Sequence, residues 1–134
     1  MRGGDLKEAE RLYREALKLN PQLSAAWANI GLLQSNARKY PEAVKSFSRA
    51  HAIEPNNPAY LMPLAQAQSQ AGQLDGAERT LQKARHIWPL DENVLGMLTT
   101  VQMNLQHFSG AADTLKDLNL IRKGKDKQTT RLLI

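Results

Sequence analysis

A sixteen-residue pattern occurs four times in this chain, and each copy begins 34 residues after the previous one, with no insertion. The clearest copy, YPEAVKSFSRAHAIEP, runs from Tyr40 to Pro55. Small and apolar residues stand at the same places in all four copies. Two of these columns are Ala9, Ala43, Ala77 and Ala111, and Tyr13, Phe47, Leu81 and Leu115. A constant period between about 20 and 50 residues is the signature of a repeat array, in which each unit packs mainly on its neighbours.

Apolar residues along the chain fall at three- and four-residue intervals, which is the spacing of one helix face. Pro21 ends the first such stretch because the residue before a proline is pushed out of the α region. We expect Asp5 and Ser24 to cap the first two helices and Gly72 to form a turn. The predicted helices span residues 6–19, 24–36, 41–53, 58–71, 75–88, 92–105 and 109–121, and another helix begins near Asp126. The short turns between these helices predict that neighbours pack antiparallel, with the residues at the Tyr13, Phe47, Leu81 and Leu115 positions filling the space between units.

Residues 24–57 form the most regular unit, with Trp27, Ile30, Gly31, Ala43, Phe47, Ala50 and Pro55. They supply an aromatic residue and an apolar–glycine pair in the first helix, then alanine, an aromatic residue and alanine in the second helix, and a final proline. This order resembles the pattern of the tetratricopeptide repeat (TPR) family. Residues 58–91 keep much of the pattern, and residues 92–125 keep less, with Lys123 where the proline would stand.

The resemblance covers about residues 5–123 and implies an all-α, right-handed superhelix. We expect about seven helices plus a short C-terminal capping helix. The chain reads as a single TPR domain over residues 1–134, which begins in the middle of a unit, and we expect it to be an excerpt of a longer protein. The expected divisions are a half repeat at 5–21, repeats at 24–57, 58–91 and 92–125, and the start of a terminal helix at 126–134.

In the TPR family the first helix of each repeat lines a concave groove, and the resemblance places twelve residues of this chain there. They are Ala28, Asn29, Leu32, Asn36, Met62, Pro63, Gln66, Gln70, Asn93, Met97, Thr100 and Asn104. None is charged, so the Lys/Arg clamp with which some family members hold an acidic peptide terminus is missing. Amides bind peptide backbone and thioethers give adaptable apolar contact, which favours a neutral or apolar peptide, or a partner helix, as the ligand. The alternative is that these are only small, solvent-tolerant helix positions.

Two local features have competing interpretations. Pro63 lies inside a predicted helix, where it either causes a kink near the first turns or frees the carbonyl of Ala59 as an acceptor. The basic residues Arg122, Lys123, Lys125 and Lys127 are either a solvated linker or a contact for an acidic partner or nucleic acid. No aromatic residue interleaves them to stack on bases, so we favour the linker.

No catalytic, metal or cofactor motif is visible in the 134 residues, which contain no cysteine and carry a net charge of +5. We therefore predict a non-enzymatic protein-interaction scaffold with no cofactor and no metal, whose partner is a protein or peptide. Nucleic acid is not an expected partner, no membrane span is expected, and the compartment is cytoplasmic by default. Two alternatives stay open: a self-associating structural array, or the substrate-recruiting arm of a larger enzyme such as a transferase.

Overall fold

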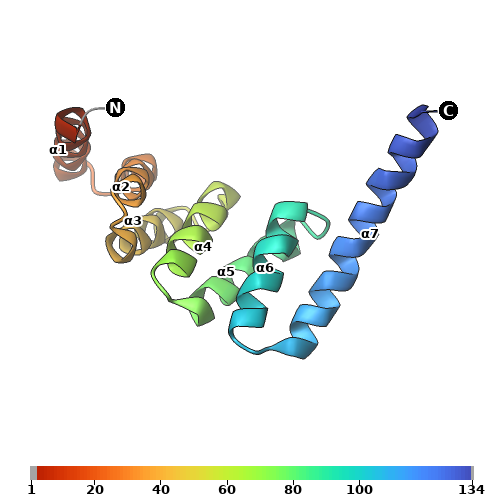
Figure 1. Ribbon diagram of the computed structural model, residues 1–134. Coiled ribbons are helices and arrows are strands. Elements are labelled where there is room, and N and C mark those ends of the chain that lie inside the picture. The colour runs from red at the N-terminus through yellow and green to blue at the C-terminus, as the bar shows by residue number, and fades with distance from the viewer. Residues whose placement is uncertain (1–2, 134) are drawn as a thin grey trace. The chain divides into compact units, whose positions relative to one another are not determined.

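The protein is all-α, as the sequence predicts. The structure, a computed structural model, describes the backbone of residues 3–133 and the side chains of residues 4–125, and no strand occurs in that part of the chain. Seven α-helices and one short 3-10 helix, η1, follow one another (Figure 1). Their bounds are α1 Gly3–Leu19, α2 Ser24–Asn36, α3 Tyr40–Ile53, η1 Pro58–Tyr60, α4 Leu61–Gln70, α5 Leu74–Ile87, α6 Glu92–Asn104 and α7 Phe108–Leu133.

The chain forms two compact units, which we call the N-terminal unit (Met1–Gln73, α1 to α4) and the C-terminal unit (Leu74–Ile134, α5 to α7). The boundary falls in the turn between α4 and α5, inside the expected repeat 58–91. Helices α5, α6 and α7 stand two repeat periods after α1, α2 and α3. Each unit therefore contains an equivalent set of three helices, and the two sets can be compared position by position.

The turn after the first helix of each repeat (α2, α4 and α6) contains a residue in the left-handed conformation. These residues recur with the 34-residue period of the sequence. They are Arg38 (φ 61°), Gly72 (φ 78°) and Gln106 (φ 61°). At each turn the next backbone N–H donates to a carbonyl five residues earlier, and each of the three bonds is 2.8 Å long: Lys39 to Gln34, Gln73 to Gln68, and His107 to Gln102. This is the Schellman arrangement that satisfies the last carbonyls of a helix. The expected turn at Gly72 is confirmed.

In the N-terminal unit, α2 and α4 both pack on α3. Ala43, Val44 and Phe47 of α3 form a buried cluster with Leu64 and Ala67 of α4, and Ala28 of α2 packs against it. Gly31 of α2 has no side chain to displace Phe47, whereas a Cβ there would lie 2.8 Å from the ring and force it to shift. A bare backbone at Gly31 therefore lets the aromatic side chain fit between the helices.

In the C-terminal unit, Leu95, Leu98 and Val101 of α6 are buried, and so are Ala111 and Leu118 of α7. Leu115, which is the counterpart of Phe47, is not buried with them. It is 41% exposed, whereas Phe47 is 2% exposed. The expectation that this column fills the space between successive repeats is confirmed at Phe47, which packs on α4 of the next repeat, and wrong at Leu115.

Several predicted helix ends differ in the structure. Ser24 is not the N-cap of α2 but its first residue; its hydroxyl donates to Glu54 and accepts from the Tyr60 hydroxyl at 3.1 Å. Asp5 lies inside the first turn of α1, which begins two residues earlier. The predicted helix 58–71 is divided, since η1 precedes α4 and Pro63 is the third residue of α4. A missing N–H is tolerated there because the first N–H groups of a helix have no partner within it.

The expected separate helix from Asp126 is wrong, because α7 continues without a break to Leu133. No proline interrupts residues 122–133. Glu92 of α6 also pairs with two basic residues of α7, at 3.6 Å to Arg122 and 2.5 Å to Lys125, which holds this part of α7 in helical register. The basic stretch is therefore part of a helix. The predicted packing of Leu132 and Leu133 lies outside the described side chains.

Candidate functional site

Charged residues are distributed unevenly between alternate helices. Helices α2 and α4 contain none, and α6 contains only Glu92, whose carboxylate is paired with α7. The helices between them, α1, α3, α5 and α7, all carry several charged residues. Helices α2, α4 and α6 are the first helices of the repeats and contain all twelve residues of the predicted groove.

The four predicted residues of α2 differ in exposure. Ala28 is half-buried and packs on the core beside α3, so much of it serves packing. Asn29 is half-buried, Asn36 is exposed, and Leu32 is 49% exposed, which is high for a leucine on a helix in contact with α3. Within residues 4–125, neither asparagine amide is engaged by another side chain. Asn29, Leu32 and Asn36 are thus accessible to a ligand.

The four predicted residues of α4 belong to the same unit as those of α2. Gln66 and Gln70 are exposed, while Met62 and Pro63 are half-buried. The start of this segment is tied to α2 through the bond between the Tyr60 and Ser24 hydroxyls. The structure therefore brings eight of the twelve predicted residues into one compact unit.

The remaining four lie on α6, in the C-terminal unit. Asn93, Thr100 and Asn104 are exposed and Met97 is half-buried. The Thr100 hydroxyl donates to the carbonyl of Gly96 at 3.0 Å, so its proton is used within α6. Asn93, Met97 and Asn104 are therefore the residues of this set with groups available to a ligand.

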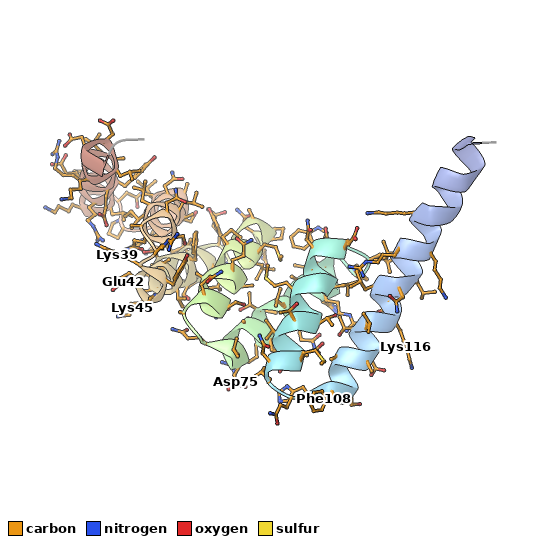
Figure 2. The ribbon with its side chains drawn as sticks, in the orientation of Figure 1. Lys39, Glu42, Lys45, Asp75, Phe108 and Lys116 are labelled. Carbon is orange, nitrogen blue, oxygen red and sulfur yellow. The ribbon has the colours of Figure 1, made fainter. Side chains whose placement is uncertain are left out.

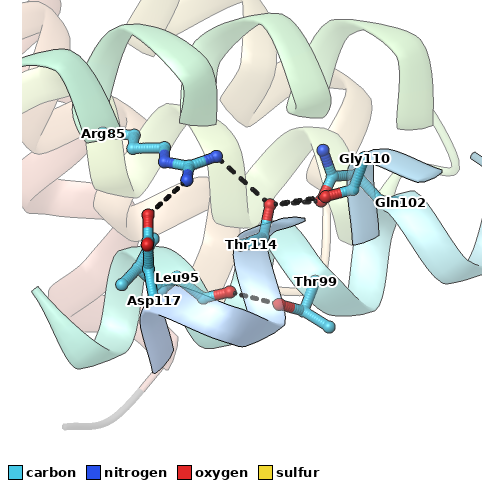
Figure 3. Close-up of polar contacts among 7 residues, drawn as sticks. All are labelled: Arg85, Leu95, Thr99, Gln102, Gly110, Thr114 and Asp117. Atoms are coloured by element: carbon cyan, nitrogen blue, oxygen red, sulfur yellow. Dashed lines mark hydrogen bonds and ion pairs between the residues drawn. The ribbon is translucent and has the colours of Figure 1, made fainter. Parts of the chain in front are cut away.

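A hydrogen bond that the sequence analysis missed recurs at equivalent positions of the two units. The Ser46 hydroxyl donates to Gln34 Oε1 at 2.6 Å, and the Thr114 hydroxyl lies 2.8 Å from Gln102 Oε1 (Figure 3). Each bond joins the first helix of a repeat to the second. The signal was present in the 34-residue period, which places glutamine at residues 34, 68 and 102 and serine or threonine at 46, 80 and 114.

The C-terminal unit has polar bridges between α5 and α7. Arg85 donates to Asp117 at 2.5 Å and to the Thr114 hydroxyl at 3.3 Å, as Figure 3 shows. His107, just before α7, lies 3.1 Å from the carboxylate of Glu78. These contacts hold α5 against α7 at two places.

The N-terminal unit has a cleft in the equivalent place. One cavity of about 490 Å³ is lined by residues of α1, of α2, of the turn between α2 and α3, and of the start of α3: Leu6, Lys7, Glu10, Arg14, Leu33, Gln34, Ala37, Lys39 and Glu42. A second, of about 330 Å³, shares Arg14, Gln34 and Glu42 with it and adds Trp27, Lys45, Ser46 and Arg49. We call the two together the α1–α3 cleft. None of the twelve predicted groove residues lines it.

Three carboxyl groups have lowered pKa values, each for a local reason. The Arg11 guanidinium, through a hydrogen bond, lowers the pKa of Glu8. Hydrogen bonds from Ser24 and then Asn57 lower the pKa of Glu54. The Lys125 ammonium lowers the pKa of Glu92, first by hydrogen bonding and then by its charge. All three carboxylates therefore stay ionised to a lower pH than an ordinary glutamate.

Across the described residues, no three His, Asp or Glu side chains come together in a way that could hold a metal ion. None of the described helices combines the length and the apolar character needed to cross a bilayer.

Paired helices repeated at a constant period, with a buried small residue at the same place in each, define a helical repeat protein. The tetratricopeptide repeat family matches residues 32–98 in one pattern and residues 1–58 in another. The chain therefore belongs to the tetratricopeptide repeat family, and its fold is that of a protein-interaction scaffold.

Two curated relatives match part of the chain. It is 30% identical over 81 residues to the peroxisomal targeting signal receptor of Yarrowia lipolytica, which is 60% of this chain and 14% of that protein. It is 31% identical over 98 residues to the N-terminal acetyltransferase A complex auxiliary subunit NAA15 of Arabidopsis thaliana, which is 72% of this chain and 11% of that protein. The chain thus spans a small part of the length of either relative.

Solved structures with the same fold include MamA. The MamA 41-end structure from Desulfovibrio magneticus RS-1 superimposes with a TM-score of 0.78 at 20% identity, covering 92% of this chain and 70% of that one. Another MamA crystal structure gives a TM-score of 0.80 at 18% identity and covers 90% of this chain and 71% of that one. At this level of identity the likeness establishes the fold.

Proposed function

We propose that the chain binds a neutral or apolar peptide, or a partner helix, through the first helices of its repeats. The observation that carries the proposal is the near absence of charge from α2, α4 and α6, in a chain whose other helices are rich in Lys, Arg, Asp and Glu. A surface without charges removes the desolvation cost of covering ionic groups, which otherwise opposes the binding of an uncharged ligand.

The side chains on α2 and α4 suit such a ligand. An Asn or Gln amide donates through its NH₂ group and accepts through its oxygen, so the amides of Asn29 and Gln66 match a peptide backbone without selecting its side chains. Leu32 and Met62 offer apolar contact, and methionine adapts its shape to different partners. Backbone hydrogen bonds would then give affinity and the apolar residues would favour uncharged sequences.

The test uses the full chain and a synthetic library of peptides that lack Asp, Glu, Lys and Arg, with binding measured by fluorescence anisotropy. We expect the double variant Asn29→Ala/Gln66→Ala to lose about thirtyfold in affinity, since each net hydrogen bond contributes about 1 kcal/mol and two are removed. The matched control is Asn119→Ala, which removes an exposed amide from α7. Equal binding by the double variant and the wild type would contradict the proposal.

A second candidate is self-association through α7. Phe108 is 59% exposed and Leu115 is 41% exposed, and their seven-residue separation places both on one side of the helix. An exposed apolar stripe of this kind favours association with an identical surface. Light scattering would show an oligomer that the Phe108→Ser/Leu115→Ser variant loses; a monomeric wild type would exclude this candidate.

A third candidate is an arm that recruits substrates to an enzyme. It is supported by the match to relatives named as auxiliary subunits of N-terminal acetyltransferase complexes. Co-purification of the full-length protein with a catalytic acetyltransferase subunit would support it, and purification without any such subunit would contradict it.

A further inference from the structure

The rim of the α1–α3 cleft is basic. Five cationic side chains line it, Lys7, Arg14, Lys39, Lys45 and Arg49, against two carboxylates, Glu10 and Glu42. Glu10 is already paired with Arg14 at 3.0 Å, so it does not neutralise the others. Within residues 4–125, neither Lys7, Lys39 nor Lys45 takes part in an ion pair. Figure 2 labels Lys39, the residue just before α3, and Glu42 and Lys45 within α3.

The inner wall of the cleft is apolar and partly fixed in position. Leu6, Leu33 and Ala37 line one end, and Trp27 lines the other. The Trp27 ring is held from two sides. Its indole N–H donates to the carbonyl of Pro21 at 3.2 Å, and the Arg49 guanidinium lies 5.6 Å from the ring centroid. A ligand in the cleft would therefore meet apolar surface inside and positive charge at the rim.

Gln34 lies where the two cavities join, and its amide is oriented. The Ser46 hydroxyl occupies Gln34 Oε1, which leaves the NH₂ group of Gln34 as the part able to donate to a ligand. The counterpart in the C-terminal unit, Gln102, is only 2% exposed, and its Nε2 would lie 2.9 Å from a Cβ at Gly110. Glu42 stands at the position of Gly110. The Gln34 amide therefore lines a cleft in the N-terminal unit, whereas the Gln102 amide is buried between helices in the C-terminal unit.

The charge of the cleft is specific to the N-terminal unit. Two repeat periods after Lys7, Lys45 and Arg49 the chain has Asp75, Asp113 and Asp117. The sign is reversed at all three positions. Asp117 there bonds to Arg85 of α5, whereas Arg49 lies over the Trp27 ring, and no ion pair joins α1 to α3 among the side chains of residues 4–125. A basic, open cleft is thus not a consequence of the repeat fold.

We infer that the α1–α3 cleft binds an acidic peptide segment with an apolar residue at its centre. The acidic side chains pair with Lys7, Lys39 and Lys45, the apolar residue contacts the wall at Leu33, and the Gln34 amide donates to a backbone carbonyl. Residues 6–14 of α1 extend about 12 Å along the cleft, which accommodates about three or four residues of extended peptide. This inference concerns a different surface and a different ligand charge from the function proposed above, and it shares no residue with that surface.

The experiment measures binding of a fluorescein-labelled peptide, with acidic residues on both sides of a central leucine, to the full chain by anisotropy. We expect binding that weakens as salt is added, because exposed charges are screened. An otherwise identical peptide with Gln and Asn in place of Glu and Asp should bind at least about tenfold more weakly. Equal binding of the two peptides, or no binding of the acidic one, would overturn the inference.

Charge reversal locates the site. We expect Lys39→Glu/Lys45→Glu to weaken binding of the acidic peptide about tenfold. The matched control, Lys83→Glu/Lys116→Glu, makes the same change at exposed positions of α5 and α7 and should leave affinity within about twofold. An equal loss in both double variants would show general attraction to a basic protein and would refute a site in the cleft.

A second measurement uses the wild-type protein, so it does not depend on whether a variant folds. The central leucine of the peptide is replaced by a photo-crosslinking residue. Crosslinks to α1 or to residues 33–37 support the inference, and crosslinks confined to the exposed residues of α4 or α6 refute it. The Asn29→Ala/Gln66→Ala variant should bind the acidic peptide normally. Its failure to bind neutral peptides would then be a separate result, so the two proposals can fail independently.

Discussion

The helices α1 to α3 and α5 to α7 are equivalent in sequence position, yet they are held together by different forces. In the N-terminal unit, an aromatic ring fits against the bare backbone of Gly31, and the space between α1 and α3 stays open. In the C-terminal unit the aromatic residue is replaced by the half-exposed Leu115, and Arg85 reaches from α5 to Asp117 and Thr114 of α7. The repeat thus sets where helices lie, while individual residues decide whether a contact is apolar or polar.

The largest difference in unfolding free energy is expected between substitutions at Phe47 and at Leu115, which occupy the same repeat position. Phe47→Ala should destabilise the N-terminal unit by about 3–5 kcal/mol because it leaves a cavity in a packed core. Leu115→Ala should cost less than about 1 kcal/mol, since much of that side chain is in water. Amide hydrogen exchange of α3 and α7 in the full chain measures each unit separately. Similar losses at the two positions would refute the contrast drawn between the units.

The recurring Gln–hydroxyl bond should matter more where it is buried. Thr114→Val removes the hydroxyl beside Gln102 and leaves a buried amide oxygen without its donor, which costs about 1–3 kcal/mol. Ser46→Ala should cost about 1 kcal/mol or less, because Gln34 is half-exposed and water can replace the hydroxyl. The two losses of stability are compared by unfolding each variant in denaturant and monitoring amide hydrogen exchange in α6 for Thr114→Val and in α2 for Ser46→Ala. A larger effect of Ser46→Ala would contradict the burial argument.

Gly31→Ala should destabilise the N-terminal unit by a net amount of about 1 kcal/mol. The new methyl group would press on the Phe47 ring, and such overpacking destabilises a core by about 1–3 kcal/mol. The higher helix propensity of alanine offsets about 1 kcal/mol of this loss. Adding Phe47→Leu should reduce the penalty by making room. The control is Gly96→Ala on α6, where nothing lies within 4 Å of the new Cβ. That variant should be stabilised, and destabilisation there would undermine the steric explanation.

The smallest expected effect is a difference between Glu54 and Glu92 in how their pKa values respond to salt. Both Glu54 and Glu92 have folded-state pKa values below the usual 4.5, so their contribution to stability is present above that pH and is lost as pH falls through the folded pKa. Added salt should raise the pKa of Glu92, which depends partly on the charge of Lys125, and should leave that of Glu54 unchanged, because Ser24 and Asn57 are neutral. NMR titration of the side-chain carboxyl carbons at low and high salt checks this. Equal salt responses would show that charge also governs Glu54.

Much of the fold was predictable from the period alone. Except at the end of α7, helix positions agreed to within a few residues, because proline and left-handed turn residues end helices locally, whatever packs around them. Even Arg38 and Gln106 could be assigned to the left-handed turn by their spacing from Gly72. The near absence of charge from each of α2, α4 and α6 was also readable from the sequence. The α1–α3 cleft was not, since its residues come from three helices and share no motif.

By itself, the sequence determined a helical repeat array, its turns and the uncharged character of its first helices, because these depend on spacing and composition along the chain. Only the tertiary structure decided that Leu115 is half-exposed, that Ser24 bonds to Glu54 and Tyr60 instead of capping a helix, and that α7 continues past Asp126. Those outcomes depend on which side chains from distant segments meet. Burial and hydrogen bonding belong to pairs of residues, and a periodic pattern specifies the members of a pair without specifying how closely they pack.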